Sequence, residues 1–324
     1  MLAVFRPGDN LSSLRIKKRE LPKLKIVILT SKNHLYCNYL LRCLSSDKAL
    51  SRDKVLIAEQ KTVVAGKNLF GSITRYMRKA GLRYTTALMV RQLLFVFWGF
   101  FKTLSRDRHS ICYPWYRSCS PHWIRMDLNN LKSLTNQKVL ESFKPDLILS
   151  LLSREKIPQK VLSLPRSGCI NLHPALLPAY RGVSPTYWCM AEGKGFGGVT
   201  LHWIEEDFDT GNIISQKSVP VAPHRTEHAF YIECIKAGIP LLLEVLRSIR
   251  AGRTPSGKTQ PKDSGIYRSL PTKSAVRDFH RRGYAAFFYA EILRGHIQLN
   301  SFLLGDTALN IHSLTQTGNT DARK

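Results

Sequence analysis

The sequence lacks the short motifs of several large enzyme classes. No Gly-X-Gly-X-X-Gly follows the first predicted strand, where residues 30–33 read TSKN, so we expect no NAD. No His-Glu-X-X-His occurs, and His173 and His202 stand far apart in the chain. Because zinc sites in enzymes draw on closely spaced ligands, we expect no metal cofactor either.

Paired cysteines are missing as well. The number of cysteines is odd and they form no Cys-X-X-Cys pair: Cys37, Cys43, Cys112, Cys119, Cys169, Cys189 and Cys234. Such scattered thiols, without a convincing signal peptide before them, are typical of buried, reduced cysteines. We therefore expect a cytoplasmic protein.

Acidic residues are scarce: 23 Asp and Glu stand against 49 Lys and Arg, which gives a formal net charge of +26. Basic residues concentrate in the amino-terminal arm, in residues 61–108, where Asp107 is the only acid, and in residues 247–282. Such a field attracts nucleic acid, anionic lipid or phosphorylated substrates. A solvated basic surface without a partner is the alternative.

The apolar run at residues 88–101, LMVRQLLFVFWGFF, is interrupted by Arg91. It is shorter than the roughly 20 residues that cross a bilayer. We expect a buried helix. The alternative is a helix on a membrane surface, flanked by Arg83 and Lys102.

The hydrophobic pattern alternates between short apolar runs and longer amphipathic segments. It predicts strands at 25–30, 54–59, 147–152, 168–173, 199–205 and 212–221, and helices at 33–44, 129–142, 158–162, 186–191 and 226–249. This order favours an α/β protein with a Rossmann-like open, mostly parallel twisted sheet and helices on both faces. We expect a mobile basic arm at 1–23, a domain at 24–252 with a basic helical insertion at about 61–125, and a short basic extension at 253–324 whose tail is disordered.

Three polar residues suit acyl transfer. Asn171 and His173 alternate at the end of a predicted strand and so share one face, and Asp209 follows further along the chain. An amide can donate to an oxyanion, an imidazole can move a proton near neutral pH, and a carboxylate can orient the imidazole. We expect these residues to be catalytic.

The residues around this set resemble a known family. Residues 164–178, LPRSGCINLHPALLP, are similar to the signature of the formyltransferases that use 10-formyltetrahydrofolate, and Arg181-Gly182, residues 198–202 and residues 209–211 continue it in order. That family includes methionyl-tRNA, phosphoribosylglycinamide and amino-sugar N-formyltransferases. The resemblance is weak at residues 24–60 and good at 130–250. It implies a transferase of one-carbon metabolism with 10-formyltetrahydrofolate as co-substrate.

The resemblance also implies roles for individual residues. Asn171 and His173 would stabilise the oxyanion, Asp209 would orient His173 and help to take the amine proton, and Leu177-Pro178 would be a cis bond. Arg181 and Gly182 would meet a phosphate of the acceptor. The pteridine would lie in a slot formed by Ser153, Arg154, Glu155, Lys156, Ile157, Glu206, Asp207 and Phe208.

The acceptor stays open at this point. A small phosphorylated amine, such as a nucleotide-linked amino sugar, is our first hypothesis. Methionyl-tRNA is the second: the basic insertion favours it, whereas residues 253–324 show little of the strand alternation of a barrel-like second domain. Water as acceptor would make the protein a hydrolase. A catalytically idle protein that binds nucleic acid or an anionic membrane is the alternative of another class.

Overall fold

The computed structural model describes residues 22–60, 69–117, 120–222, 226–261 and 265–295. The arm as far as residue 21, the start of the expected insertion at 61–68, and the tail from residue 296 lie outside these ranges. The described cysteines are all buried and unpaired, as expected from their spacing.

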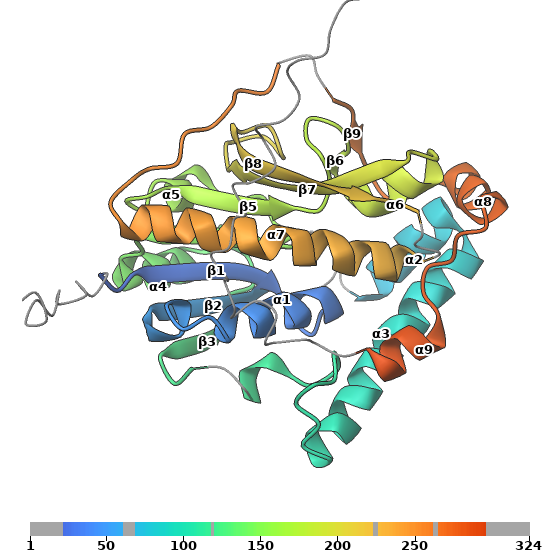
Figure 1. Ribbon diagram of the computed structural model, residues 1–324, viewed down its shortest axis with the longest axis horizontal. Coiled ribbons are helices and arrows are strands. Elements are labelled where there is room, and N and C mark those ends of the chain that lie inside the picture. The colour runs from blue at the N-terminus through green and yellow to red at the C-terminus, as the bar shows by residue number, and fades with distance from the viewer. Residues whose placement is uncertain (1–21, 61–68, 118–119, 223–225, 262–264, 296–324) are drawn as a thin grey trace, which may run out of the picture.

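The main sheet has seven strands in the order β3-β2-β1-β4-β5-β7-β8 (Figure 1). Their bounds are β1 Lys25–Ser31, β2 Lys54–Gln60, β3 Trp123–Asp127, β4 Leu147–Leu151, β5 Cys169–His173, β7 Phe196–Trp203 and β8 Ile213–Pro220. The strands from β3 to β5 pair in parallel, whereas β7 and β8 are antiparallel to their neighbours. This is the open, mostly parallel, Rossmann-like sheet that the sequence predicts.

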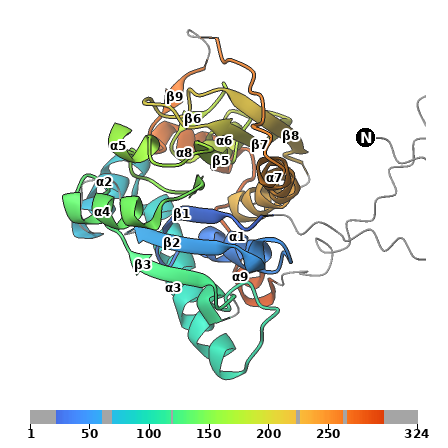
Figure 2. The ribbon, with the colours of Figure 1, turned by 90° about the vertical axis from the view of Figure 1, so that its left-hand side faces the viewer.

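Helices cover both faces of the sheet (Figure 2). One face is covered by α1 (Leu35–Ser45) and α7 (Glu227–Arg250), and the other by α4 (Leu134–Phe143) and α5 (Gln159–Leu162). Alternate residues of β1 serve the two cores: Ile26 and Ile28 pack towards α1 and α7, and Val27 and Leu29 towards α4 and α5. Because parallel strands are buried on both faces, their sequences read as continuous apolar runs.

Helix α7 supports the strands that carry the predicted catalytic residues. Thr226 caps it, since its hydroxyl accepts a hydrogen bond from Ala229 N–H at 3.1 Å, as the sequence predicts. Further along, a Cβ on Gly238 would lie 2.9 Å from Val199 Cγ2. Only glycine therefore lets α7 lie this close to the sheet.

The described part of the expected insertion at 61–125 is largely helical. It forms α2 (Leu69–Ala80), α3 (Leu82–Leu104) and the short 3-10 helix η3 (Trp115–Arg117), but its predicted end overlaps β3, the edge strand of the main sheet. In β3 only Trp123 is buried, so its sequence does not alternate as a half-buried strand would.

The expectation that residues 88–101 form a buried helix is wrong. These residues lie in α3, but only 11% of its most apolar 18-residue window is buried inside the structure. The helix is 23 residues long and apolar enough to cross a membrane by length and composition alone. Its buried face instead carries polar anchors such as Arg91, which donates to Tyr36 Oη at 2.9 Å.

After α7 the described chain adds small elements beside the main sheet. Strand β9 (Tyr267–Arg268) pairs with β6 (Arg181–Gly182), and helices α8 (Lys273–Arg281) and α9 (Tyr289–Arg294) follow; α6 (Pro185–Ala191) packs against α8. Residues 252–259, GRTPSGKT, have the spacing of a phosphate-binding P-loop. They follow a helix rather than a strand, and Lys258 forms a bridge to Ile213, so the strand–loop–helix of a P-loop is not formed.

Candidate active site

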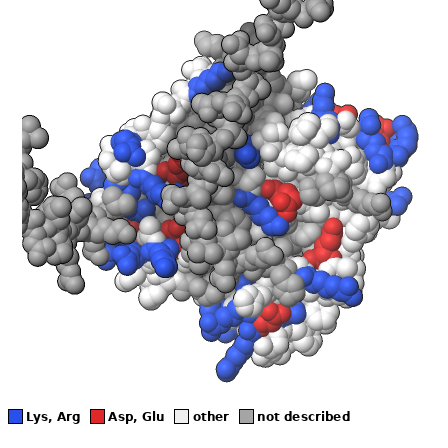
Figure 3. Space-filling view, viewed as in Figure 1, with Lys and Arg blue, Asp and Glu red and all other residues white. Residues whose placement is uncertain are grey.

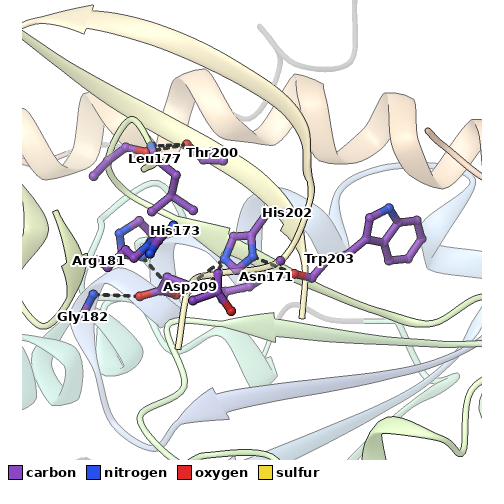
Figure 4. A network of polar contacts seen from close by, with 12 residues as sticks. Asn171, His173, Leu177, Arg181, Gly182, Thr200, His202, Trp203 and Asp209 are labelled. Atoms are coloured by element: carbon purple, nitrogen blue, oxygen red, sulfur yellow. Dashed lines mark hydrogen bonds and ion pairs between the residues drawn. The ribbon is translucent and has the colours of Figure 1, made fainter. Parts of the chain in front are cut away.

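Two antiparallel strands bring the polar residues together (Figure 4). Asn171 of β5 lies opposite His202 of β7, and His173 lies opposite Thr200. Because side chains alternate along each strand, all four point to one face. The site lies where β5 ends, at the edge at which open α/β sheets hold their ligands.

The amide of Asn171 is engaged by two neighbours. Its Nδ2 lies 3.0 Å from His202 Nε2 and 3.2 Å from Asp209 Oδ1. The other ring nitrogen of His202, Nδ1, lies 2.8 Å from the carbonyl oxygen of Trp203. A neutral His202 with its proton on Nδ1 satisfies all of these contacts, since Nε2 then accepts from Asn171. Both N–H donors of Asn171 are thereby used, and its Oδ1 is the atom left to offer to a substrate.

Asp209 is the hub of the cluster. Its Oδ2 accepts a hydrogen bond from Gly182 N–H at 2.8 Å, and its Oδ1 lies 3.6 Å from His173 Nδ1 and 3.5 Å from His202 Nε2. Burial raises the pKa of this carboxyl. Its attraction to the protonated forms of His173 and His202, together with the hydrogen bond from Gly182 N–H, outweighs burial and holds the pKa well below its usual range. Asp209 is therefore a permanent negative charge in the site.

His173 is held as a neutral imidazole. Its Nε2 donates to the carbonyl oxygen of Tyr180 at 2.9 Å, which fixes the ring. Burial lowers the pKa of His173, although Asp209 and the Tyr180 carbonyl act in the opposite direction. At neutral pH the ring has one proton, on Nε2, and Nδ1 faces Asp209 as a proton acceptor whose charged form would be stabilised there.

Further hydrogen bonds fix the loop after His173. The Leu177–Pro178 bond is cis, as the resemblance predicts. Thr200 Oγ1 accepts from Leu177 N–H at 3.1 Å and donates to Ala175 O at 2.6 Å. Gln216 Nε2 adds a hydrogen bond to Leu177 O at 2.8 Å. The loop is thus fixed to β7 and β8.

The loop of Asp209 is held from the other side. Gln260 Nε2 donates to the carbonyl oxygens of Asp209 at 3.0 Å and Gly211 at 2.7 Å. A Cβ on Gly211 would lie 2.0 Å from Trp203 O, so this turn packs against β7 only with glycine there. Asp209 itself has a φ of 57°, in the left-handed region that Asp tolerates better than most residues.

The two segments predicted to form the pteridine slot face each other. Lys156, after β4, lies 3.7 Å from the carboxylate of Asp207 in the β7–β8 loop. Glu155 accepts from Leu131 N–H at 3.0 Å, and Ser153 Oγ donates to Gln60 at 2.6 Å. Ile157 is buried, Glu206 is exposed, and Phe208 is half exposed beside Tyr267. The two loops that would line the slot are thus held in shape by their own polar contacts.

Two predicted residues lie elsewhere than expected. Arg181 is buried rather than at the surface, and it donates to Gln260 Oε1 at 2.9 Å. It thereby supports the residue that holds the Asp209 loop. Arg154 points from the slot towards α2, where Tyr76 raises its pKa.

His202 and Gln260 belong to the site, but neither was predicted from the sequence to be a site residue. His202 had a signal, because Thr200-Leu201-His202 alternates as Asn171-Leu172-His173 does. Gln260 had none, since it lies 51 residues after Asp209 in a stretch without regular structure. Among the described residues, no group of three His, Cys, Asp or Glu side chains has the geometry to hold a metal ion.

Comparison with known proteins assigns the class. The model of the family described as formyl transferase matches residues 101–246, a range that contains Asn171, His173, His202 and Asp209. Over this region the chain matches the formyl transferase family.

The curated relatives agree with this class. Methionyl-tRNA formyltransferase of Syntrophus aciditrophicus is 36% identical over 118 residues, which is 36% of this chain and 38% of that protein. The enzyme of the same name from Halothermothrix orenii is 36% identical over 141 residues, 44% of this chain and 43% of that protein. The chain therefore spans about two fifths of the length of the curated relatives it matches.

Solved structures are similar at a lower level. A likely sugar N-formyltransferase, Rv3404c of Mycobacterium tuberculosis, has a TM-score of 0.49 and 16% identity, with 82% of this chain and 90% of that chain covered. A sugar N-formyltransferase from Shewanella has a TM-score of 0.47 and 17% identity, with 80% and 87% covered. At these scores the likeness carries no argument about the acceptor.

Proposed function

We propose that this protein transfers the formyl group of 10-formyltetrahydrofolate to a primary amine. The observation that carries the proposal is the cluster of Asn171, His173 and Asp209 at the carboxyl end of β5, inside the region that matches the formyl transferase family. A buried neutral imidazole beside a permanently ionised carboxylate is suited to accept a proton from an amine.

The reaction needs one proton acceptor and one site for negative charge. The amine nitrogen forms a bond to the formyl carbon, and the carbonyl oxygen becomes an oxyanion. His173 Nδ1 takes a proton from the amine, and Asp209, 3.6 Å away, stabilises the imidazolium that forms. The oxyanion then re-forms the carbonyl as the C–N10 bond of the folate breaks. The electron pair of that bond stays on N10, which takes up the proton from His173.

Asn171 contributes differently from the sequence expectation. With both N–H groups held by His202 and Asp209, its Oδ1 accepts a hydrogen bond from the attacking amine and orients the lone pair towards the formyl carbon. Donation to the oxyanion would require the amide to turn over, which would break both of these contacts. The protonated Nδ1 of His173 is then the donor for the oxyanion.

The acceptor that we propose first is a small phosphorylated amine such as a nucleotide-linked amino sugar. Arg154 follows β4, the strand beside β5, and its guanidinium would meet the negative charge of such an acceptor. Methionyl-tRNA is the second acceptor. The curated relatives named methionyl-tRNA formyltransferase and the net charge of +26 favour it.

The test is a turnover assay with the purified chain, 10-formyltetrahydrofolate and a panel of amines. The panel contains nucleotide-linked amino sugars, phosphoribosyl amines and charged initiator tRNA, with water alone as the control for hydrolysis. Our proposal predicts a formylated product with one acceptor and release of tetrahydrofolate that depends on it. Folate turnover that is equal with and without every amine would identify a hydrolase instead.

A further inference from the structure

Helix α3 carries large apolar side chains on the face that is exposed to solvent. Leu93, Phe97, Phe100 and Leu104 follow one another at four-, three- and four-residue spacing and are each 55% to 65% exposed. This spacing places them on one face of a helix. A contiguous exposed apolar stripe of this kind marks an interaction surface.

The opposite face of α3 is the one fixed to the fold. Tyr84 donates to Glu227 at 2.9 Å, Arg91 donates to Tyr36 at 2.9 Å, and Phe95 is buried in the main core. Lys102 pairs with Asp107 at 2.8 Å where the helix ends. The helix, about 34 Å long for 23 residues, is thus anchored along its length, and its outward stripe is presented as a rigid face.

The exposed charged residues on both sides of the stripe in the sequence are basic. Residues 69–105 contain no Asp or Glu, and the exposed basic residues Arg75, Arg78, Lys79 and Arg83 lie on α2 and at the start of α3. Arg106 and Arg108 are exposed just after its end. An apolar stripe with basic residues at both ends is complementary to a surface that is apolar inside and anionic outside.

A cationic cavity adjoins the amino-terminal end of helix α3. It has a volume of about 490 Å³, lies between the α2–α3 turn and α8, and is lined by Arg83, Lys273, Arg277 and Arg281 among others. The acid next to it, Asp278, pairs with Arg281 at 3.1 Å. Figure 3 shows basic residues gathered over α8 at the right-hand edge of the molecule. This cavity has the size and charge for a phosphate headgroup.

We propose that the outward face of α3 rests on an anionic phospholipid bilayer, with a lipid phosphate in the cationic cavity beside Leu82. The helix lies in the plane of the interface rather than across it, because Arg91 and Phe95 tie it to the fold. The membrane would hold the enzyme with its active site free, since Asn171, His173 and Asp209 lie on other elements. This inference does not depend on the proposed reaction.

The test is flotation of the full chain with vesicles. We expect the protein to float with vesicles of equal parts phosphatidylcholine and phosphatidylglycerol, and not with phosphatidylcholine alone. The triple change Leu93→Ser, Phe97→Ser, Phe100→Ser should weaken vesicle binding by roughly tenfold or more, because it removes the inserted side chains. The matched control is the pair Leu134→Ser and Ile266→Ser, two exposed apolar residues on other elements, which should leave binding unchanged.

A charge series separates the cavity from net charge. The change Arg83→Gln, Arg277→Gln, Arg281→Gln should weaken binding by about fivefold for each residue removed. The control Lys132→Gln, Lys138→Gln, Lys217→Gln removes the same charge from exposed sites elsewhere and should cost less than half as much on the logarithmic scale. Inorganic phosphate at millimolar concentration should not release the bound protein, whereas release would assign the cavity to a free phosphate and overturn the proposal.

Other results would also overturn it. If the protein binds vesicles of phosphatidylcholine alone as strongly as the mixed vesicles, the contact does not require an anionic lipid. If the apolar triple variant floats like the wild type, the stripe is not the contact. If the wild type is a dimer without lipid and the triple variant is a monomer, the stripe is covered by a second copy. Formyl transfer in solution is measured on the same variants, so loss of folding or of the reaction is distinguished from loss of membrane binding.

Discussion

Replacing Asp209 with Asn is the most informative change in the site. The carboxylate lies 3.6 Å from His173 Nδ1, and the two side chains are 10% and 5% exposed. At an effective dielectric constant of ~20, this separation corresponds to about 4 to 5 kcal/mol of attraction once His173 is charged. The neutral imidazole of the resting enzyme gains almost none of it.

The expected effect is on kcat rather than on folate binding. Because the proton has only partly moved in the transition state, we expect Asp209→Asn to lower kcat by between about 30-fold and 1,000-fold. The measurement is steady-state release of tetrahydrofolate, together with circular dichroism to verify the fold. The control is Asp278→Asn in α8, whose side chain is 46% exposed and pairs with Arg281 at 3.1 Å. It should change kcat by less than about threefold.

The pH profile of activity shows in which direction Asp209 shifts the pKa of His173. Burial holds the pKa of His173 below its usual value, and Asp209 acts to raise it. The base form of His173 is therefore present at neutral pH, and activity falls as the pH drops through this lowered pKa. Without the carboxylate the pKa of His173 falls further, so the acid limb of the variant should move to lower pH. An acid limb that moves to higher pH, or a kcat within fivefold of the wild type, would refute this reasoning.

The remaining predictions concern positioning and stability. His202→Ala should lower kcat by about 10- to 100-fold with little change in the folate KM, because Asn171 loses the partner at 3.0 Å that orients its amide; an unchanged kcat would contradict this role. Gly211→Ala should lower kcat at least as much as His202→Ala, since its Cβ would lie 2.0 Å from Trp203 O. We expect this loss of activity together with a native circular dichroism spectrum. Arg250→Ala should lower the free energy of unfolding in urea by about 3 to 5 kcal/mol, because it leaves the buried carboxylate of Asp53 without its partner, whereas a loss below ~1 kcal/mol would show that the pair is not essential.

The main sheet could be predicted from the sequence because its strands are buried on both faces. The expected strand at 25–30 is β1, one residue longer, and the expected strand at 147–152 is β4, one residue shorter. Two local signals mark the ends of α7. The side chain of Thr226 caps its start, and Gly252, just after its end, has a φ of 75°. Such signals are local and need no knowledge of the rest of the fold.

Elements whose stability comes from tertiary contacts could not be predicted in this way. β6 and β9 are two residues each and form only where distant loops meet. The orientation of α3 is a second case. Its composition is that of a buried helix, and only the contacts of Arg91 and Tyr84 with other elements show which face turns inward.

The site divides along the same line. The types and order of Asn171, His173 and Asp209 were sufficient to nominate them. The hydrogen bonds that decide their protonation, from Gly182 N–H to Asp209 and from His173 to the Tyr180 carbonyl, are made by backbone groups. Backbone contacts do not depend on residue type and so cannot be predicted from the sequence. The burial of Arg181 and the hydrogen bonds of both Asn171 N–H groups were therefore found only in the structure.

The most direct test of the account is formyl transfer from 10-formyltetrahydrofolate by the wild type and by His173→Ala, measured side by side with the full amine panel. We predict an N-formylated product with the wild type, detected by mass spectrometry, and a loss of roughly 100-fold or more in the variant, with both proteins folded by circular dichroism. A wild type that formylates no amine, or a variant that turns over as fast as the wild type, would contradict it.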